Sequence, residues 1–184
     1  AYQPREGYRI SFFQDIPMIS DNYEIINGFD VTQYAPLFYD MVGKLNFYGK
    51  AINTLKGDDA RLSKRLYASG SKLRGFEKGK IGPLDNGDYV GGNYVSGLNF
   101  SSTLPQILPS LEKFDFNLFF DAANVWGVDY SDTIDDSNEI RSSFGLGMDV
   151  LTPIGPMNFS LAQPVTKKST DKTESFRFNI GTTF

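Results

Sequence analysis

Cysteine and histidine are both absent from the 184 residues of this chain. Without cysteine there is no disulfide framework, no thiolate metal site and no thiol nucleophile. Without histidine there is no Ser-His-Asp or Cys-His catalysis and no histidine-based metal site. Apolar runs long enough for a transmembrane helix are missing too, since such a helix needs about 20 consecutive apolar residues. These absences predict a protein that is not an enzyme and that takes no metal and no cofactor.

Aromatic residues, by contrast, are abundant, with 16 Phe and 10 Tyr in the chain. A soluble sandwich rich in aromatic residues would have this composition. So would a membrane barrel, whose strands are apolar on one face and polar on the lumen side. The net charge is -4, and the basic residues are scattered along the chain. We therefore expect no nucleic-acid partner.

Apolar and polar residues alternate through most of the chain. The clearest example follows residue 113, where four apolar side chains alternate with three polar ones: Phe114, Phe116, Leu118 and Phe120 against Asp115, Asn117 and Asp121. A period of two over such a length predicts a strand with one apolar and one wet face.

The same pattern predicts eight strands, at about 8–15, 23–35, 41–54, 93–101, 114–121, 140–150, 157–161 and 176–184. Short Pro-containing turns alternate with longer connections, and an even number of antiparallel strands places both termini on one side. The predicted fold is all-β: an antiparallel transmembrane β-barrel that forms a single domain over residues 1–184. Lys44, Lys50, Arg141 and Arg177 all point inward in this prediction, which favours a wet lumen.

Two connections stand out from the short turns. The acidic one at 127–138 carries Asp129, Asp132, Asp135 and Asp136. Such clusters can bind calcium, but a solvated outer loop is the simpler interpretation and the one we expect. The other, at 56–91, has about 35 residues, far more than a usual hairpin connection, and is expected to be functional.

The connection at 56–91 contains Leu73-Arg74-Gly75-Phe76 and, a few residues later, Ile81-Gly82-Pro83. An arginine suits a carboxylate or carbonyl fork, and a glycine permits positive φ or close approach of the backbone. The phenylalanine can anchor the tip of the connection.

This motif resembles the sixth-loop signature of the Omp85 family of outer-membrane barrels. The segments 119–126, 153–164 and 176–181 resemble family strands in the same order and spacing. The resemblance covers nearly the whole chain and is closest to the barrel-assembly branch of the family. It implies a protein of the bacterial outer membrane, in contact with outer-membrane lipid, that inserts and folds other β-barrel proteins.

The resemblance also assigns roles to residues. In the family, the loop arginine points into the lumen and meets carboxylates on the wall; here these positions fall on Arg74 and Asp121. The second acidic position falls on Asn99, which keeps a hydrogen bond and removes a charge. The end of the chain resembles the β-signal by which barrels are recognised, through Phe176, Phe178, Ile180 and Phe184.

The implied partners are unfolded outer-membrane proteins, together with the periplasmic domains and lipoprotein subunits of an assembly complex. Two other functions stay open. One is a self-contained eight-stranded barrel with a structural or ligand-binding role, and the other is a protein translocation pore of the two-partner type. Eight strands that close on themselves leave room only for side chains. A loop clamped in the lumen therefore predicts a half-barrel, whose missing strands come from an N-terminal half or a second copy.

Overall fold

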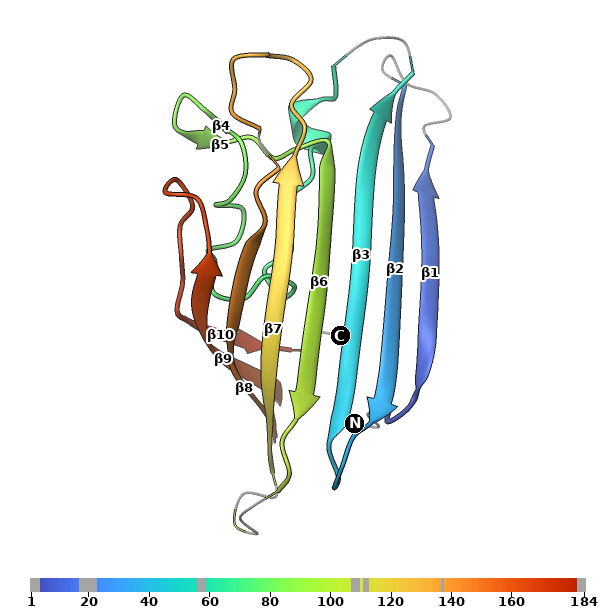
Figure 1. Ribbon diagram of the computed structural model, residues 1–184, viewed down its shortest axis with the longest axis vertical. Coiled ribbons are helices and arrows are strands. Elements are labelled where there is room, and N and C mark those ends of the chain that lie inside the picture. The colour runs from blue at the N-terminus through green and yellow to red at the C-terminus, as the bar shows by residue number, and fades with distance from the viewer. Residues whose placement is uncertain are drawn as a thin grey trace.

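Eight strands form one antiparallel sheet in the order β1-β2-β3-β6-β7-β8-β9-β10 (Figure 1). The computed structural model describes residues 4–16, 23–55, 59–106, 110, 113–136 and 138–181. The strands are β1 (Gly7–Asp15), β2 (Glu24–Pro36), β3 (Val42–Thr54), β6 (Tyr94–Thr103), β7 (Phe114–Trp126), β8 (Arg141–Thr152), β9 (Gly155–Thr166) and β10 (Phe176–Ile180). The prediction of three strands before the long connection and five after it is confirmed.

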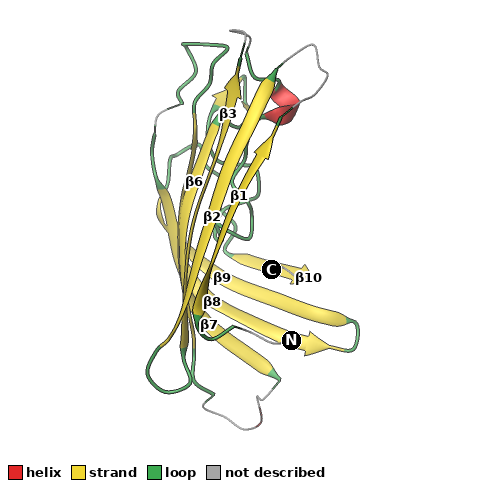
Figure 2. Ribbon diagram, turned by 90° about the vertical axis from the view of Figure 1, so that its right-hand side faces the viewer, coloured by secondary structure: helices red, strands yellow, loops and turns green. Residues whose placement is uncertain are grey.

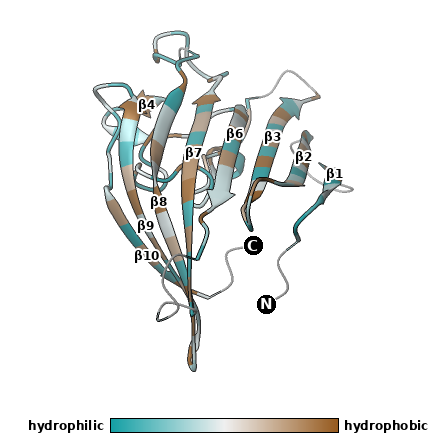
Figure 3. Ribbon diagram, turned by 60° about the horizontal axis from the view of Figure 1, so that its bottom comes forward, coloured by the Kyte–Doolittle hydropathy of each residue, from teal (hydrophilic) through white to brown (hydrophobic). Residues whose placement is uncertain are grey.

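The sheet is curved and open. The strands follow one another round an arc, and β8, β9 and β10 lie at an angle to the upright wall of β1, β2, β3 and β6 (Figures 2 and 3). Within the described residues, β1 pairs only with β2 and β10 only with β9. This is the arrangement expected of a half-barrel and differs from that of eight strands closing on themselves. No helix among the described residues is long and apolar enough to cross a membrane.

The two faces of the sheet differ as the alternation predicts. Many apolar side chains on the outer face are exposed, among them Tyr8, Ile10, Phe47, Phe100, Leu118, Phe144, Leu161 and Phe178. The inner face carries a row of polar side chains that the register aligns across five strands, namely Thr32, Asn46, Asn99, Asp121 and Ser143. A sheet of this kind suits lipid outside and a polar interior.

The connection from Leu55 to Asn93 is called the long loop below, and its described part from Asp59 onward packs against the inner face. It contains a short 3-10 helix, η1 (Leu62–Lys64), and a small hairpin of β4 (Leu84–Asp85) and β5 (Asp88–Tyr89). The hairpin was not predicted, although its Asn86-Gly87 turn is a strong hairpin signal. Both turn residues have positive φ, 49° and 87°, as the tight two-residue turn requires.

A small core joins the long loop to the wall. Leu73, Phe76 and Ile81 from the loop pack with Val95 and Val125 from the strands. These side chains are almost fully buried, and burying an apolar side chain of this size contributes about 1.5–3 kcal/mol. The loop is thus a packed part of the fold, with its arginine motif on the inner wall.

Candidate functional site

Arg74 and Asp121 form a bidentate ion pair at the centre of the inner face. The guanidinium Nε donates to one carboxylate oxygen at 2.7 Å and Nη2 donates to the other at 2.8 Å. The backbone N–H of Arg74 also donates to the carboxylate, at 3.0 Å. The Asp121 side chain is 0% exposed and that of Arg74 is 19% exposed. The predicted contact is therefore present, and it has the fork geometry that makes such pairs strong.

Two wall residues complete the surroundings of this pair. Asn99 on β6 donates from Nδ2 to Asp121 at 2.9 Å and to the backbone carbonyl of Lys72 at 2.7 Å. The amide thus links wall and loop at the position where the resemblance implies a second carboxylate. Phe119 on β7 lies under the guanidinium, whose central carbon is 3.5 Å from the ring centroid. This cation–π contact was not predicted, because the alternation had been traced only through the even-numbered phenylalanines of the strand.

Gly75 lets the loop lie directly on the wall. Its φ is +92°, and an added Cβ would stand 3.1 Å from Cβ of Ala162 and 3.2 Å from Cβ of Ser143. Ser143 donates from its hydroxyl to the carbonyl of Arg74. The close approach and positive φ expected of this glycine are both present.

Arg177 holds the same turn of the loop from the other side. Its guanidinium donates to the carbonyls of Gly70 and Phe76, the second at 2.6 Å, and to the Glu174 carboxylate at 3.1 Å. The inward direction predicted for Arg177 was correct, but the wet environment was wrong: the loop's backbone carbonyls occupy the space. Sequence reasoning missed this contact because no pattern in the sequence pairs an arginine with distant carbonyls.

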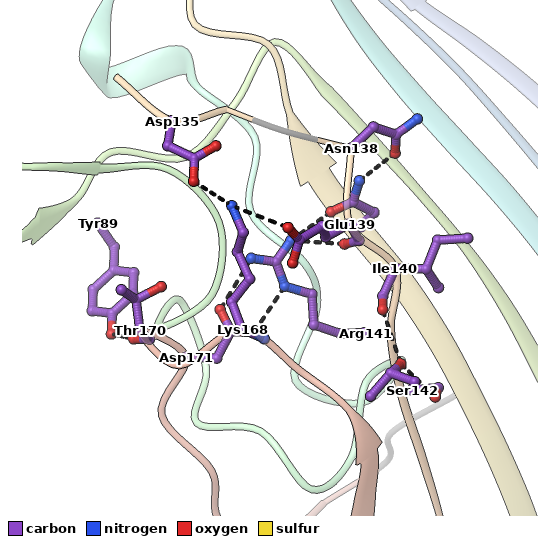
Figure 4. A network of polar contacts seen from close by, with 12 residues as sticks. Tyr89, Asp135, Asn138, Glu139, Ile140, Arg141, Ser142, Lys168, Thr170 and Asp171 are labelled. Atoms are coloured by element: carbon purple, nitrogen blue, oxygen red, sulfur yellow. Dashed lines mark hydrogen bonds and ion pairs between the residues drawn. The ribbon is translucent and has the colours of Figure 1, made fainter. Parts of the chain in front are cut away.

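Arg141 shows the same difference between prediction and structure. It was expected to face a wet lumen, yet its side chain is 1% exposed and forms a bidentate pair with Asp171, at 2.9 and 3.1 Å (Figure 4). Asn124 accepts a third hydrogen bond from the guanidinium at 2.6 Å. The pair ties the start of β8 to the connection between β9 and β10.

The acidic connection after β7 also holds neighbouring segments together. Asp129 accepts hydrogen bonds from the backbone N–H of Ala60 at 2.8 Å and from Nδ2 of Asn93 at 2.9 Å, and it pairs with the buried Arg65. Burial opposes ionisation, but these hydrogen bonds outweigh it and hold the pKa of Asp129 below its ordinary value. The expectation of a merely solvated loop is wrong for this residue. Among the described residues, no group of three or more acidic side chains is placed to hold a metal ion.

The C-terminal strand places its apolar residues on the outer face. Phe176, Phe178 and Ile180 are between 41% and 59% exposed, and the Phe159 ring packs against both phenylalanines. The face predicted for these three residues is confirmed. Phe184 lies outside the described residues. The role of this strand as a β-signal stays a prediction.

The sequence of this chain is similar to those of known outer-membrane and assembly proteins. The family model described as the Omp85 superfamily domain matches residues 1–184. The outer membrane protein assembly factor BamA of Neisseria meningitidis is 28% identical over 91% of this chain and 21% of its own length. The human sorting and assembly machinery component 50 homolog is 27% identical over 70% of this chain and 29% of its own length.

A solved structure extends the similarity to the fold. BamA from Haemophilus ducreyi lacking POTRA domains 1–3 matches with a TM-score of 0.85 and 26% identity, over 97% of this chain and 38% of that one. The chain spans between a fifth and a third of the length of the curated relatives it matches, as coverages of 21%, 25% and 29% show.

Proposed function

The chain belongs to the Omp85 superfamily and is a protein of the bacterial outer membrane, and from this premise we propose that it forms the C-terminal barrel segment of an outer-membrane protein assembly factor. Such a segment would help other β-barrel proteins to insert and fold in the outer membrane. The proposed activity makes and breaks no covalent bond and needs no cofactor.

The observation that carries the proposal is the long loop clamped on the inner face of an open, lipid-facing sheet. The Arg74–Asp121 pair fixes the arginine motif to the wall, while the outer edges of β1 and β10 stay unpaired within the described residues. An unpaired strand edge presents a row of N–H and C=O groups that can template a further strand. A rigid interior next to a pairing edge is what a barrel-inserting protein needs.

The proposed partners follow from the same arrangement. Unfolded outer-membrane proteins would add strands at the β10 side by β-augmentation. The edge of β1 would pair with further barrel strands, because every inner-face residue of β1 is exposed and the loop covers none of them. Periplasmic domains and lipoprotein subunits would complete the assembly complex.

Reconstitution of the full-length protein in lipid vesicles tests the proposal. The rate at which an unfolded outer-membrane protein folds into these vesicles is measured with the wild type and with Arg74→Ala. We expect the wild type to accelerate folding and Arg74→Ala to lose most of the acceleration. Lys78→Gln is the matched control, since Lys78 is an exposed cation of the same loop; its rate should equal that of the wild type.

Two outcomes would contradict the proposal. Wild-type vesicles that fold the client no faster than empty vesicles would exclude an assembly role. Passage of an unfolded passenger protein into the vesicle interior, without barrel folding in the membrane, would instead identify a translocation pore.

A further inference from the structure

Arg177 connects the last strand of the sheet to the arginine loop. It lies on the inner face of β10, opposite Ser160 of β9. From there its guanidinium reaches the backbone carbonyls of Gly70, three residues before the motif, and of Phe76, its last residue. Both contacts are to main-chain oxygens, so they restrain the course of the loop itself. Hydrogen bonds from a charged donor are among the stronger ones in proteins.

The loop leaves space for this guanidinium at Gly70, which has no side chain. A Cβ atom at Gly70 would lie 2.8 Å from Nη1 of Arg177, so a larger side chain would displace the arginine. Arg177 is itself oriented by Glu174, three residues earlier, at 3.1 Å. The side chain of Arg177 is only 13% exposed. The guanidinium is thus largely shielded from solvent, and Gly70 on one side and Glu174 on the other fix its position.

A short backbone ladder runs beside the arginine. Glu77 donates its N–H to the carbonyl of Lys172, and Lys172 donates to the carbonyl of Lys80, both at 3.0 Å. Glu174 donates to the carbonyl of Gly75, also at 3.0 Å. The connection between β9 and β10 therefore pairs with the loop as one strand pairs with another.

These contacts matter because β10 is weakly held by the sheet alone. It has 5 residues, whereas β9 has 12, and within the described residues its other edge is unpaired. The loop in turn is fixed to the wall by Arg74 and Asp121, across the interior from β10. A chain of contacts thus runs from Asp121 on β7, through the loop turn, to Arg177 on β10.

We propose that Arg177 is a positioning residue that couples the arginine loop to the last strand, so that release of Arg74 from Asp121 loosens β10. The coupling sets how firmly the end strand is held. Its use in strand addition at the β10 edge rests on the proposed function; the coupling itself does not.

Amide hydrogen exchange of the folded full-length protein in lipid vesicles tests the coupling, with no client protein present. Arg177→Gln should raise exchange at both 70–77 and 176–180 about tenfold, the change expected from losing one hydrogen bond to a charged group. Asp121→Asn should raise exchange at 176–180 by a similar factor, although no hydrogen bond or ion pair joins Asp121 to β10 within the described residues. Lys78→Gln should leave both segments at wild-type rates.

A second variant covers the case in which Arg177→Gln does not fold. Gly70→Ala keeps the charge and crowds the guanidinium, so it should reproduce the faster exchange at 176–180. Unchanged exchange in β10 for Asp121→Asn, or a rise confined to the loop for Arg177→Gln or Gly70→Ala, would overturn the proposal.

Folding of an unfolded client protein, measured in parallel, separates the two claims. Faster β10 exchange in a protein whose wild type folds no client would refute the proposed function and support the coupling. Normal client folding by the wild type, with unchanged β10 exchange in the variants, would support the proposed function and refute the coupling.

Discussion

The inner faces of β1 and β7 belong to one sheet, yet their surroundings are opposite. Every residue of β1 is exposed, whereas Phe119, Asp121, Ala123 and Val125 of β7 are between 0% and 3% exposed. In the sequence, the two strands show the same alternation of apolar and polar residues, which does not distinguish their inner faces. The difference arises because the long loop packs against β7 and its neighbours and reaches as far as β2, where Lys72 pairs with Asp30, but leaves every residue of β1 exposed.

The inner face binds the loop where its buried polar side chains find hydrogen-bond partners in the loop. On β7 and β8, buried polar groups such as Asp121, Ser143 and Arg141 have partners in the loops, as buried polar groups require. On β1, inner polar groups face open space. The strands that the long loop covers, called the covered half below, therefore have the satisfied polar contacts of a protein interior. The inner face of β1 lacks such contacts, and its edge is open to further strands.

The largest effect should come from breaking the most deeply buried pair of the covered half. Arg141→Ala leaves the Asp171 carboxylate buried without its partner, and removing one member of a buried ion pair costs about 3–5 kcal/mol. We expect a fall of this size in the free energy of unfolding, measured by urea titration in lipid vesicles. Arg9→Ala, at an inner position of the uncovered β1, should change it little. Equal losses for the two variants would show that the two halves do not differ.

A pair of phenylalanines compares the halves with the same side chain. Phe119 is 3% exposed under the loop arginine, and Phe13 on the inner side of β1 is 40% exposed. Phe119→Ala should cost about 3–5 kcal/mol of unfolding free energy, the usual range for a buried phenylalanine. Phe13→Ala should cost well under half of that. The same urea titration decides, and a larger loss at Phe13 would contradict the account.

Acid should loosen the contact between the long loop and the connection after β7. The pKa of Asp129 is lower in the folded protein than in the unfolded chain, so its contribution is complete above an ordinary aspartate pKa of 3.8 and is lost as pH falls through the lowered value. Losing its charged hydrogen bonds should cost about 1.5–3 kcal/mol. Proteolysis of segment 59–65 should accelerate below pH 4 in the wild type. Asp129→Asn should already be sensitive at pH 7, and a wild type insensitive down to pH 2 would argue against this contact.

The smallest effect is expected where the covered half ends. Lys72 in the loop pairs with Asp30 on β2 at 2.5 Å, but the two side chains are 32% and 23% exposed. Pairs open to solvent contribute about 0.2–1 kcal/mol. Lys72→Gln should therefore lower the unfolding free energy by less than 1 kcal/mol, and the loss should shrink further in 1 M salt. A loss comparable with that of Arg141→Ala would place the boundary of the covered half beyond β2.

Much of the sheet was predictable because membrane strands alternate strictly between two environments. The eight strands were expected, with bounds that differ from the observed ones by up to five residues. The contact between Arg74 and Asp121 was expected from the family resemblance. The surroundings of Arg141 and Arg177 were not predictable. Alternation gives the direction of a side chain but does not tell whether water or a loop from elsewhere in the chain occupies the space it enters.

The structure inside the long loop was also not predictable from alternation. The β4–β5 hairpin is only two residues on each side, too short for a periodic pattern to emerge, and only Asn86-Gly87 signals it. Phe119 breaks the apolar-out alternation of its own strand, and its ring lies inward under the guanidinium of Arg74. Long-range contacts, and not local preference, decide these positions.

The central claim is that Arg74 and Asp121 act as one unit that holds the loop on the wall. A double-mutant cycle with Arg74→Met and Asp121→Asn tests it most directly, with unfolding free energies measured by urea titration in lipid vesicles. The account predicts two large single losses and a double loss smaller than their sum, with a coupling energy of about 0.5–3 kcal/mol. Strictly additive losses would contradict it.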